Sequence, residues 1–223
     1  MRRSQQDRSD ATRAELVRAG RRLFAESGYN AIGIEAVVRE AGVTRGALYH
    51  LFGDKVELFV AVFEQVEEDL VQRLTAALPD GQIGVDMVDL LHEGIEAWLD
   101  ACADPEVQRI LLLDGPSVLG WERWREIELR YGVGLVEALL AGAMDEEAID
   151  RMPLRAATHV LIGALDEAAM FVIGADDPVA ARTEVTEVLK RLIAGLVPVR
   201  KAAKKPIKKP VKKAAKARSR PRA

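Results

Sequence analysis

The amino-acid sequence predicts an all-α protein of about nine helices, and three observations support this fold class. Apolar residues recur at intervals of three and four along most of the chain, which is the period of one helix face. Glycine, proline and capping residues divide these stripes into segments of helical length. No window shows the strict alternation of apolar and polar residues, or the turn-rich spacing, that is typical of a sheet.

Four helices are expected before the break at residues 79–81, which read Pro-Asp-Gly. Apolar stripes predict the first two, the second of which covers about residues 34–41. Thr44 is a suitable N-cap for a third helix, because a hydroxyl can accept a hydrogen bond from a free amide of the first turn. Asp54, followed by Glu57 three residues later, fits the capping pattern and opens a fourth helix.

Five further helices are expected in the remainder of the chain. Asp-Pro pairs at 104–105 and 177–178 mark two helix starts, because proline is well tolerated at the first helical position. The segment DGPS is expected to end the short helix that opens at residue 104. The expected helices cover about residues 85–102, 104–117, 121–143, 153–174 and 178–196.

Charge divides the chain into three parts, although the formal net charge is only −3. Residues 1–52 hold 9 basic and 6 acidic residues, and residues 53–199 hold 11 basic and 29 acidic residues. Residues 200–223 hold 12 basic residues and no acidic residue. An acidic body would repel a polyanion that the two basic ends could bind.

These boundaries give three expected parts: a DNA-binding domain at 1–53, a ligand-binding and dimerisation domain at 54–197, and a disordered basic tail at 198–223. The single Cys102 excludes an intramolecular disulfide and a cysteine-rich metal site. No leader and no stretch of about 18 apolar residues is evident. We therefore expect a cytoplasmic protein, associated with the nucleoid and with no membrane partner.

The segment GVTRGALYHLF, residues 42–52, carries the most specific pattern. On a helical wheel Ala47, Leu48 and Leu51 fall on one face, which is expected to meet the core. The opposite face carries Arg45, Gly46, Tyr49 and His50. A tight turn at Ala41-Gly42-Val43 joins this helix to the preceding one, so the two predict a helix-turn-helix. The alternative is a short surface helix with a solvated face.

Residues 10 to about 60 resemble the DNA-binding domain of the TetR family of bacterial transcriptional regulators. The resemblance rests on the run FAESGYNAIGIEAVVREAGVTRGALYHLFGDKVELF, residues 24–59. It implies a recognition helix capped by Thr44 and a backbone contact from Lys55. One departure is the pair Ile32 and Gly33, where the family usually has hydroxyl residues. The residues expected to contact double-stranded DNA are Thr44, Arg45, Gly46, Tyr49, His50 and Lys55.

The last two helices are expected to form a homodimer interface. Few polar residues interrupt 154–174, and its small residues allow close approach of another helix, so more than one side is expected to be buried. A single-chain bundle could use both faces, but a two-fold dimer uses them more naturally. The expected interface residues are Val160, Gly163, Ala164, Ala168, Val185, Leu189 and Leu192.

The resemblance also implies a small apolar or aromatic ligand bound within the body. The aromatic residues available to line a pocket are Trp98, Trp121, Trp124, Tyr131 and Phe171, with ordinary core packing as the alternative for each. The sequence carries no recognisable catalytic set, metal-ligand spacing or phosphate-binding glycine loop, so no enzyme, metal or cofactor is expected. The paired acidic residues of the body are interpreted as helix surface rather than as acid–base catalysts.

The sequence therefore predicts a homodimeric, ligand-responsive repressor that binds a near-palindromic operator. The lysine-rich tail resembles those of linker histones in composition, and is expected to add non-specific affinity for DNA or to be an inert extension. Two alternatives remain open. One is a nucleoid-associated protein with weak sequence preference, and the other is a helical enzyme.

Overall fold

The computed structural model describes residues 5–78 and 86–198, and all regular structure in these two ranges is helical. The short α6, the π-helical segment η1 and α7 follow one another without a break and count as one helical unit. The described residues then form nine helical units, as predicted. The elements are α1 (Gln5–Ser27), α2 (Ile34–Ala41), α3 (Arg45–Phe52), α4 (Lys55–Ala77), α5 (Met87–Cys102), α6 (Pro105–Val107), η1 (Gln108–Asp114), α7 (Gly115–Leu119), α8 (Trp121–Asp145), α9 (Leu154–Ile173) and α10 (Pro178–Ala194).

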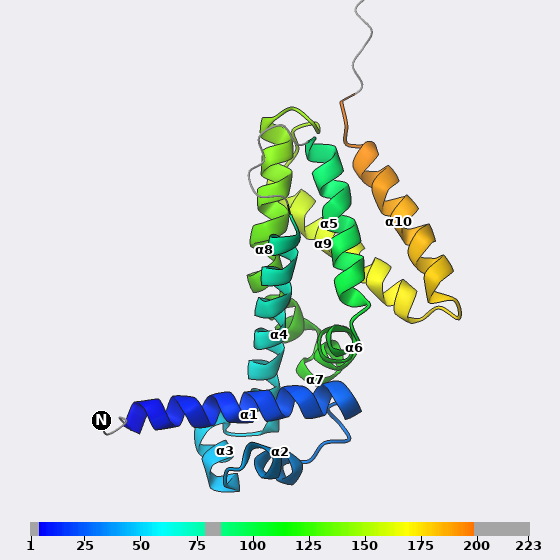
Figure 1. The fold of residues 1–223 in the computed structure, drawn as a ribbon. Coiled ribbons are helices and arrows are strands. Elements are labelled where there is room, and N and C mark those ends of the chain that lie inside the picture. The colour runs from blue at the N-terminus through cyan, green and yellow to red at the C-terminus, as the bar shows by residue number, and fades with distance from the viewer. Residues whose placement is uncertain (1–4, 79–85, 199–223) are drawn as a thin grey trace, which may run out of the picture.

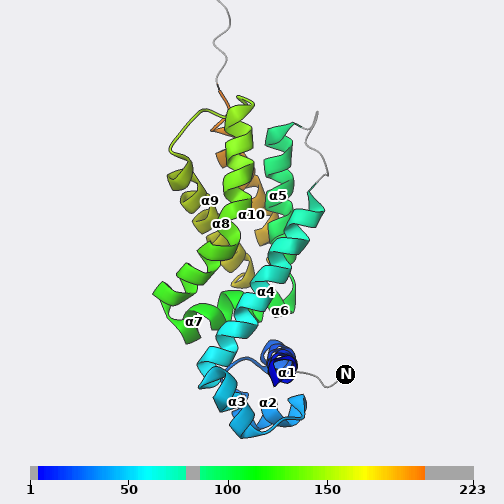
Figure 2. The same ribbon diagram turned by 90° about the vertical axis from the view of Figure 1, so that its left-hand side faces the viewer.

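The helices form a small head and an elongated body (Figure 1). The head consists of α1, α2 and α3, with α1 lying across the lower end of α4. Helix α4 rises from the head into the body, where α5 and α8 run beside it (Figure 2). Helices α9 and α10 pack against each other and against α5. Because α4 belongs to both parts, any tilt of α4 in the body moves the head.

The predicted capping residues define the ends of the head helices. The Thr44 hydroxyl accepts a hydrogen bond from the Ala47 amide at 3.2 Å, and Asp54 accepts one from the Glu57 amide at 2.9 Å. Gly42 ends α2 in the left-handed conformation, with φ of 66°. That conformation is favourable for glycine and costly for most other residues, so Gly42 sets the sharp turn between α2 and α3.

The helical run that begins at Pro105 ends at Leu119, two residues beyond the predicted end at 117, because the chain continues from η1 into α7 through DGPS. Pro116 lies in the first turn of α7, where the missing amide hydrogen is not needed. Gly115 allows the backbone to pass close to two aromatic rings. A Cβ atom on Gly115 would lie 2.7 Å from the Phe63 ring and 2.9 Å from the Trp124 ring.

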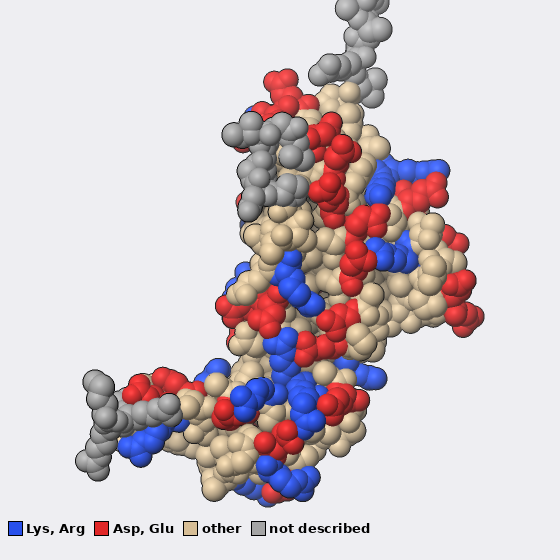
Figure 3. Space-filling view, in the orientation of Figure 1, with Lys and Arg blue, Asp and Glu red and all other residues tan. Residues whose placement is uncertain are grey.

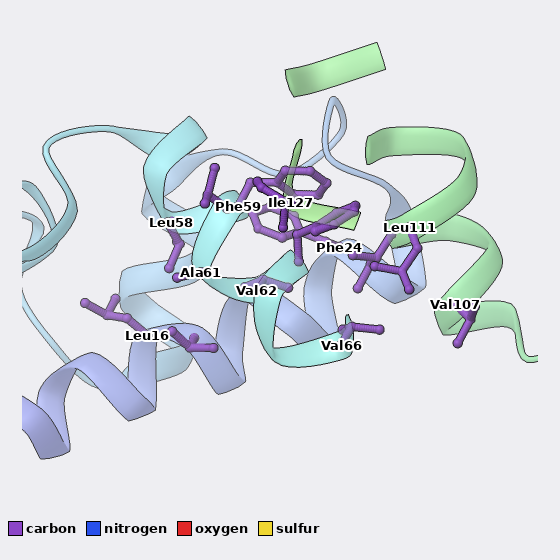
Figure 4. Packing of buried hydrophobic residues seen from close by; sticks show 14 of the residues in the cluster. Leu16, Phe24, Leu58, Phe59, Ala61, Val62, Val66, Val107, Leu111 and Ile127 are labelled. Atoms are coloured by element: carbon purple, nitrogen blue, oxygen red, sulfur yellow. The ribbon is translucent and has the colours of Figure 1, made fainter. Parts of the chain in front are cut away.

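The hydrophobic core has two clusters, and the first joins the head to the body. Side chains from α1, α4, η1 and α8 contribute to it, including Leu16, Phe24, Phe59, Leu111 and Ile127. Figure 4 shows Phe24 and Phe59 lying together beside Leu111 and Ile127. The Phe24 and Phe59 ring centroids are 5.6 Å apart. The head is therefore fixed on α4 and η1 by apolar packing rather than by a flexible linker.

The second cluster lies in the far part of the body, among α5, α8, α9 and α10. Among the described residues, α9 is long and apolar enough to cross a membrane, judged by length and composition alone. It nevertheless carries Asp166, which pairs with Arg125 of α8 at 2.8 Å, and it packs against α5, α8 and α10. These contacts place one side of α9 in the second core cluster.

Candidate nucleic-acid interface and ligand cavity

Helix α3 presents the face that the sequence predicts. Leu48 is completely buried and Phe52 is nearly so, which fixes α3 against the core of the head. Ala47 and Leu51 are half-buried beside them. The remaining face carries the exposed side chains of Arg45, Tyr49 and His50 next to Gly46. The helix-turn-helix geometry thus leaves polar donors on the outer side of α3.

Arg45 is held in place before any partner binds. Its guanidinium donates to a Glu35 carboxylate oxygen at 2.9 Å and to the Tyr49 hydroxyl at 3.1 Å. The guanidinium carbon also lies 5.3 Å from the centre of the Tyr49 ring. Glu35, in the first turn of α2, is a partner that the sequence analysis missed. A phosphate or a base edge would have to compete with this carboxylate for Arg45.

Within residues 5–78 and 86–198, no contact requires position 46 to be glycine. A Cβ atom there would meet only the Thr44 hydroxyl, at 3.9 Å. Replacing glycine by alanine at a position that alanine can adopt without strain stabilises a protein by about 0.4–1 kcal/mol. The bare patch at Gly46 therefore favours the approach of another surface over any internal packing requirement.

Lys55, at the start of α4, is occupied within the head. Its ammonium donates to the Tyr29 carbonyl at 2.6 Å and lies 3.7 Å from the centre of the Tyr29 ring. Partial burial lowers the pKa of Lys55. A phosphate contact from Lys55 would require the ammonium to be shared with Tyr29 or released from it.

Helix α2 begins without a side-chain cap. Gly33 is the N-cap, and no side chain there accepts a hydrogen bond from the first turn. Ile32 is half-buried and packs against the first core cluster. The departure at Ile32 and Gly33 therefore leaves free amides at this end of α2, which are suitable for an anion.

Polar contacts link the head to the body. Arg21 of α1 donates two hydrogen bonds to Glu106 of α6, both at 2.7 Å, and also contacts Asp69 of α4. The Tyr29 amide donates to the buried Asp114 carboxylate at 2.7 Å. These contacts join the end of α1 and the loop after it to the region around η1.

The body contains two adjoining apolar hollows between α4, α5, α8 and α9. Their volumes are about 70 Å³ and about 60 Å³. Both are lined by Leu74, Trp98, Leu135, Val136 and Leu165. We refer to the two hollows together as the body cavity.

Acidic side chains line one end of the body cavity, so their assignment to the helix surface is wrong. Glu67, Glu128 and Asp166 are 6%, 7% and 8% exposed. Each lies on a buried helix face, a position that the sequence could have indicated for Glu67, between Val66 and Leu70. The sequence analysis placed weight on their charge and not on their position in the apolar stripe.

One guanidinium serves this acidic end. Arg125 donates to Glu128 at 2.5 Å and to Asp166 at 2.8 Å. Burial raises the pKa of Glu67 to about 8 and that of Glu128 to about 9, and it also raises the pKa of Asp166. Among the described groups that shift the pKa of Glu67 there is no cation, so its neutral form is favoured at neutral pH.

The five aromatic residues expected in a pocket are distributed over different regions. Trp98 lines the body cavity, and its indole nitrogen donates to the Leu165 carbonyl at 3.1 Å. Tyr131 is half-buried against the first core cluster. Trp121 and Trp124 line a separate surface cleft of about 310 Å³, and Phe171 lies on an apolar groove of α9 and α10. Only Trp98 faces the body cavity.

The expected interface residues also divide into two groups. Val160 and Leu192 are exposed, and Gly163, Ala164 and Val185 are half-buried. Ala168 and Leu189 are buried within the chain, in the second core cluster. Phe171 and Val188 lie on the same groove as Leu192 and are 51% and 57% exposed. The sequence analysis did not assign these two residues to the interface.

Two family descriptions match most of the described chain. Residues 16–62 match the bacterial regulatory proteins of the tetR family, and residues 88–196 match the tetracyclin repressor-like C-terminal domain. The HTH-type transcriptional regulator CymR of Pseudomonas putida is 35% identical over 151 residues, which cover 67% of this chain and 73% of CymR. The transposon Tn10 TetC protein of Escherichia coli is 29% identical over 147 residues, covering 65% and 72% of the two chains.

Solved structures agree with these relatives. A TetR-family transcriptional regulator from Pectobacterium atrosepticum is 30% identical and superposes with a TM-score of 0.75, covering 87% of this chain and 98% of that one. RolR, solved with its ligand resorcinol, is 20% identical with a TM-score of 0.68, covering 84% of this chain and 90% of RolR. The second likeness shows the shared fold.

Proposed function

Since the chain belongs to the TetR family of bacterial transcriptional regulators, we propose that it is a repressor that binds a near-palindromic operator as a homodimer and is released by a small ligand. The observation that carries this proposal is the outer face of α3. Polar side chains surround Gly46 there, and nothing in the described part of the chain requires glycine at that position. An exposed face with polar donors on a helix-turn-helix is available for the major groove.

In this proposal the residues of α3 make different kinds of contact with DNA. Arg45 reads a base edge or a phosphate, while Tyr49 and His50 donate to the DNA backbone. Thr44 and Gly46 bring the first turn of α3 close to the duplex. Lys55 adds a backbone contact when a phosphate draws it from the Tyr29 carbonyl.

The dimer is proposed to form through α9 and α10. Exposed apolar side chains gather on the groove between these helices, and Val160 on α9 is 73% exposed. Contiguous apolar surface of this kind is typical of an interface. A two-fold axis here would set two heads in successive major grooves, about 34–36 Å apart.

The body cavity is the proposed ligand site. Its lining includes Leu74 of α4, and the same helix begins at Lys55, directly after the recognition helix. A ligand that prefers a different tilt of α4 would shift the population of head positions. The heads of the dimer would then no longer match the spacing of the operator. A cytoplasmic location follows from a DNA target.

The test is a selection of genomic fragments on the purified full-length protein, followed by sequencing and gel shift. We expect discrete, near-palindromic sites with affinity well above that for random DNA. Broad coverage without a shared site would contradict the proposal. That outcome would support a nucleoid-associated protein dominated by the basic residues at 200–223, which lie outside the described residues.

A further inference from the structure

The acidic end of the body cavity has acceptors that the chain does not use. Glu67 lines the cavity and is only 6% exposed, yet within the described residues it forms no hydrogen bond or ion pair. The Asp166 Oδ1 atom is likewise buried without a hydrogen-bond partner. Asp166 is bonded to Arg125 only through its other oxygen. Buried polar groups are normally satisfied, so the Glu67 carboxyl group and this one free oxygen of Asp166, at the same cavity, point to a missing donor.

The charges around these acceptors indicate what kind of donor is missing. Arg125 is the guanidinium that contacts the cluster, and it already serves Glu128 and the other oxygen of Asp166. Cys102 interacts electrostatically with Glu67 and Asp166, and Tyr131 interacts with Glu67, but neither of these two groups is a cation. Three carboxyl groups therefore face one positive charge.

The rest of the cavity wall is apolar. Leu135, Leu165 and the aromatic side chain of Trp98 lie on it. An ammonium group is attracted by an aromatic face as well as by a carboxylate. An anionic ligand would meet the acidic end unfavourably, because only Arg125 could offset its charge.

We propose that the body cavity binds an organic amine: an apolar, aromatic body along Trp98 with a cationic ammonium donating to Glu67 and to Oδ1 of Asp166. This inference rests on the proposed function, because it names the chemical class of the regulatory ligand. It also implies that binding displaces a proton. The neutral carboxyl group of Glu67 ionises when the ammonium arrives, so affinity rises with pH as long as the amine stays protonated.

The experiment uses three probes with the same aromatic body: 1-naphthylmethylamine, 1-naphthylmethanol and 1-naphthoate. Binding to the full-length protein is measured by calorimetry without DNA, in two buffers of different ionisation enthalpy. We expect the amine to bind at least about tenfold more tightly than the alcohol, since a charge-assisted hydrogen bond is the stronger kind. The difference between buffers should reveal proton release.

Two variants test the assignment of the site. Glu67→Gln, which keeps the size of the side chain, should remove most of the preference for the amine and the proton release. Glu68→Gln, at the exposed neighbouring position of α4, should leave both unchanged. A circular dichroism melt of each variant checks that it is folded.

Equal affinity for the three probes, preference for the alcohol or the carboxylate, or binding of none of them would each overturn the inference. So would an amine preference that survives in Glu67→Gln. The proposed function is tested separately, by gel shift on the selected operator without any probe. If the protein binds the operator but shows no preference for the amine, only the ligand class is rejected. If the protein without probe binds no operator, the proposed function is rejected.

Discussion

At the scale of single residues, two helical glycines of this chain have opposite surroundings. Gly115 lies against the rings of Phe63 and Trp124, so its missing side chain is required for packing. A Cβ atom on Gly46 of α3 would meet only the Thr44 hydroxyl among the described residues, at 3.9 Å. Packing explains the first glycine, whereas the second is consistent with a partner that approaches α3 closely.

Gly46→Ala is expected to separate stability from function. Alanine should raise the free energy of unfolding by about 0.5–1 kcal/mol, because it restricts the unfolded chain and favours the helix. The added methyl group should weaken operator binding by obstructing the close approach to DNA. Urea denaturation and gel shift measure the two effects. Gly134→Ala, at an open helical position of α8, should stabilise the protein without changing operator affinity. Unchanged affinity for Gly46→Ala would remove the argument for close approach.

Glu67 should make the protein less stable as pH rises. Burial raises its folded-state pKa from 4.5 to about 8, so the folded protein holds a proton that the unfolded chain releases. The stabilisation from this proton is complete below the unfolded pKa and is lost as pH rises through the folded pKa. Glu67→Gln, which mimics the neutral acid, should gain stability relative to the native protein between about pH 5 and pH 8.

Urea denaturation across that pH range, with Glu68→Gln as the exposed control, measures this difference. Glu128 and Asp166 remain in both proteins, so the difference curve reports mainly on Glu67. Its slope cannot exceed about 1.4 kcal/mol per pH unit for one proton. A flat curve would mean that Glu67 titrates normally and is hydrated in the folded state.

At the scale of elements, local chemistry made most of the helices predictable. Thr44, Asp54 and Gly42 act through neighbours within a few residues, and the sequence contains all of that information. The continuation through DGPS was not predictable in this way. It depends on Gly115 fitting between Phe63 of α4 and Trp124 of α8, which are distant in sequence.

In the candidate sites, too, features set by neighbouring residues were predictable, and features set by contacts distant in sequence were not. The outer face of α3 was predictable from helical periodicity, whereas the Glu35 contact with Arg45 depends on the crossing of α2 and α3. The five aromatic residues were expected in one pocket because of their residue type, but they lie in different regions. Which residues line the cavity depends on how α4, α5, α8 and α9 pack. The same packing brings Glu67 and Asp166, which are 99 residues apart in the sequence, to one cavity.

The groove of α9 and α10 should be the surface that makes a dimer. Val188→Asp places a charge at a 57% exposed position, so the fold of one chain should tolerate it while an apolar interface should not. We expect a monomer in sedimentation analysis at concentrations where the native protein is a dimer. Ala138→Asp, at an exposed position of α8, is the control and should stay dimeric. A dimeric Val188→Asp protein would place the interface elsewhere.

At the scale of the whole molecule, the first core cluster makes the head and the first turns of α4 one packed unit with η1. The proposed domain boundary between residues 53 and 54 lies between α3 and α4 in the sequence. Residues on both sides of it belong to the same core cluster. On the face drawn in Figure 3, acidic side chains run along the body and basic ones gather where the body meets the head. A duplex held by the head would be repelled by the body.

The basic tail should offset this repulsion without adding sequence preference. Residues 200–223 carry 12 of the 32 basic residues, and cations that neutralise phosphates release counterions from the duplex. Removal of 199–223 should weaken binding to operator and to random DNA by similar factors. The slope of log affinity against log salt should become shallower by about 0.9 for each duplex phosphate that the tail no longer neutralises. Gel shifts over a series of salt concentrations measure both effects, and the selected operator should stay the same because α3 is unaltered. A tail that instead competes with DNA for the acidic body predicts stronger binding after truncation at low salt, and an unchanged slope would show that the tail neutralises no phosphate.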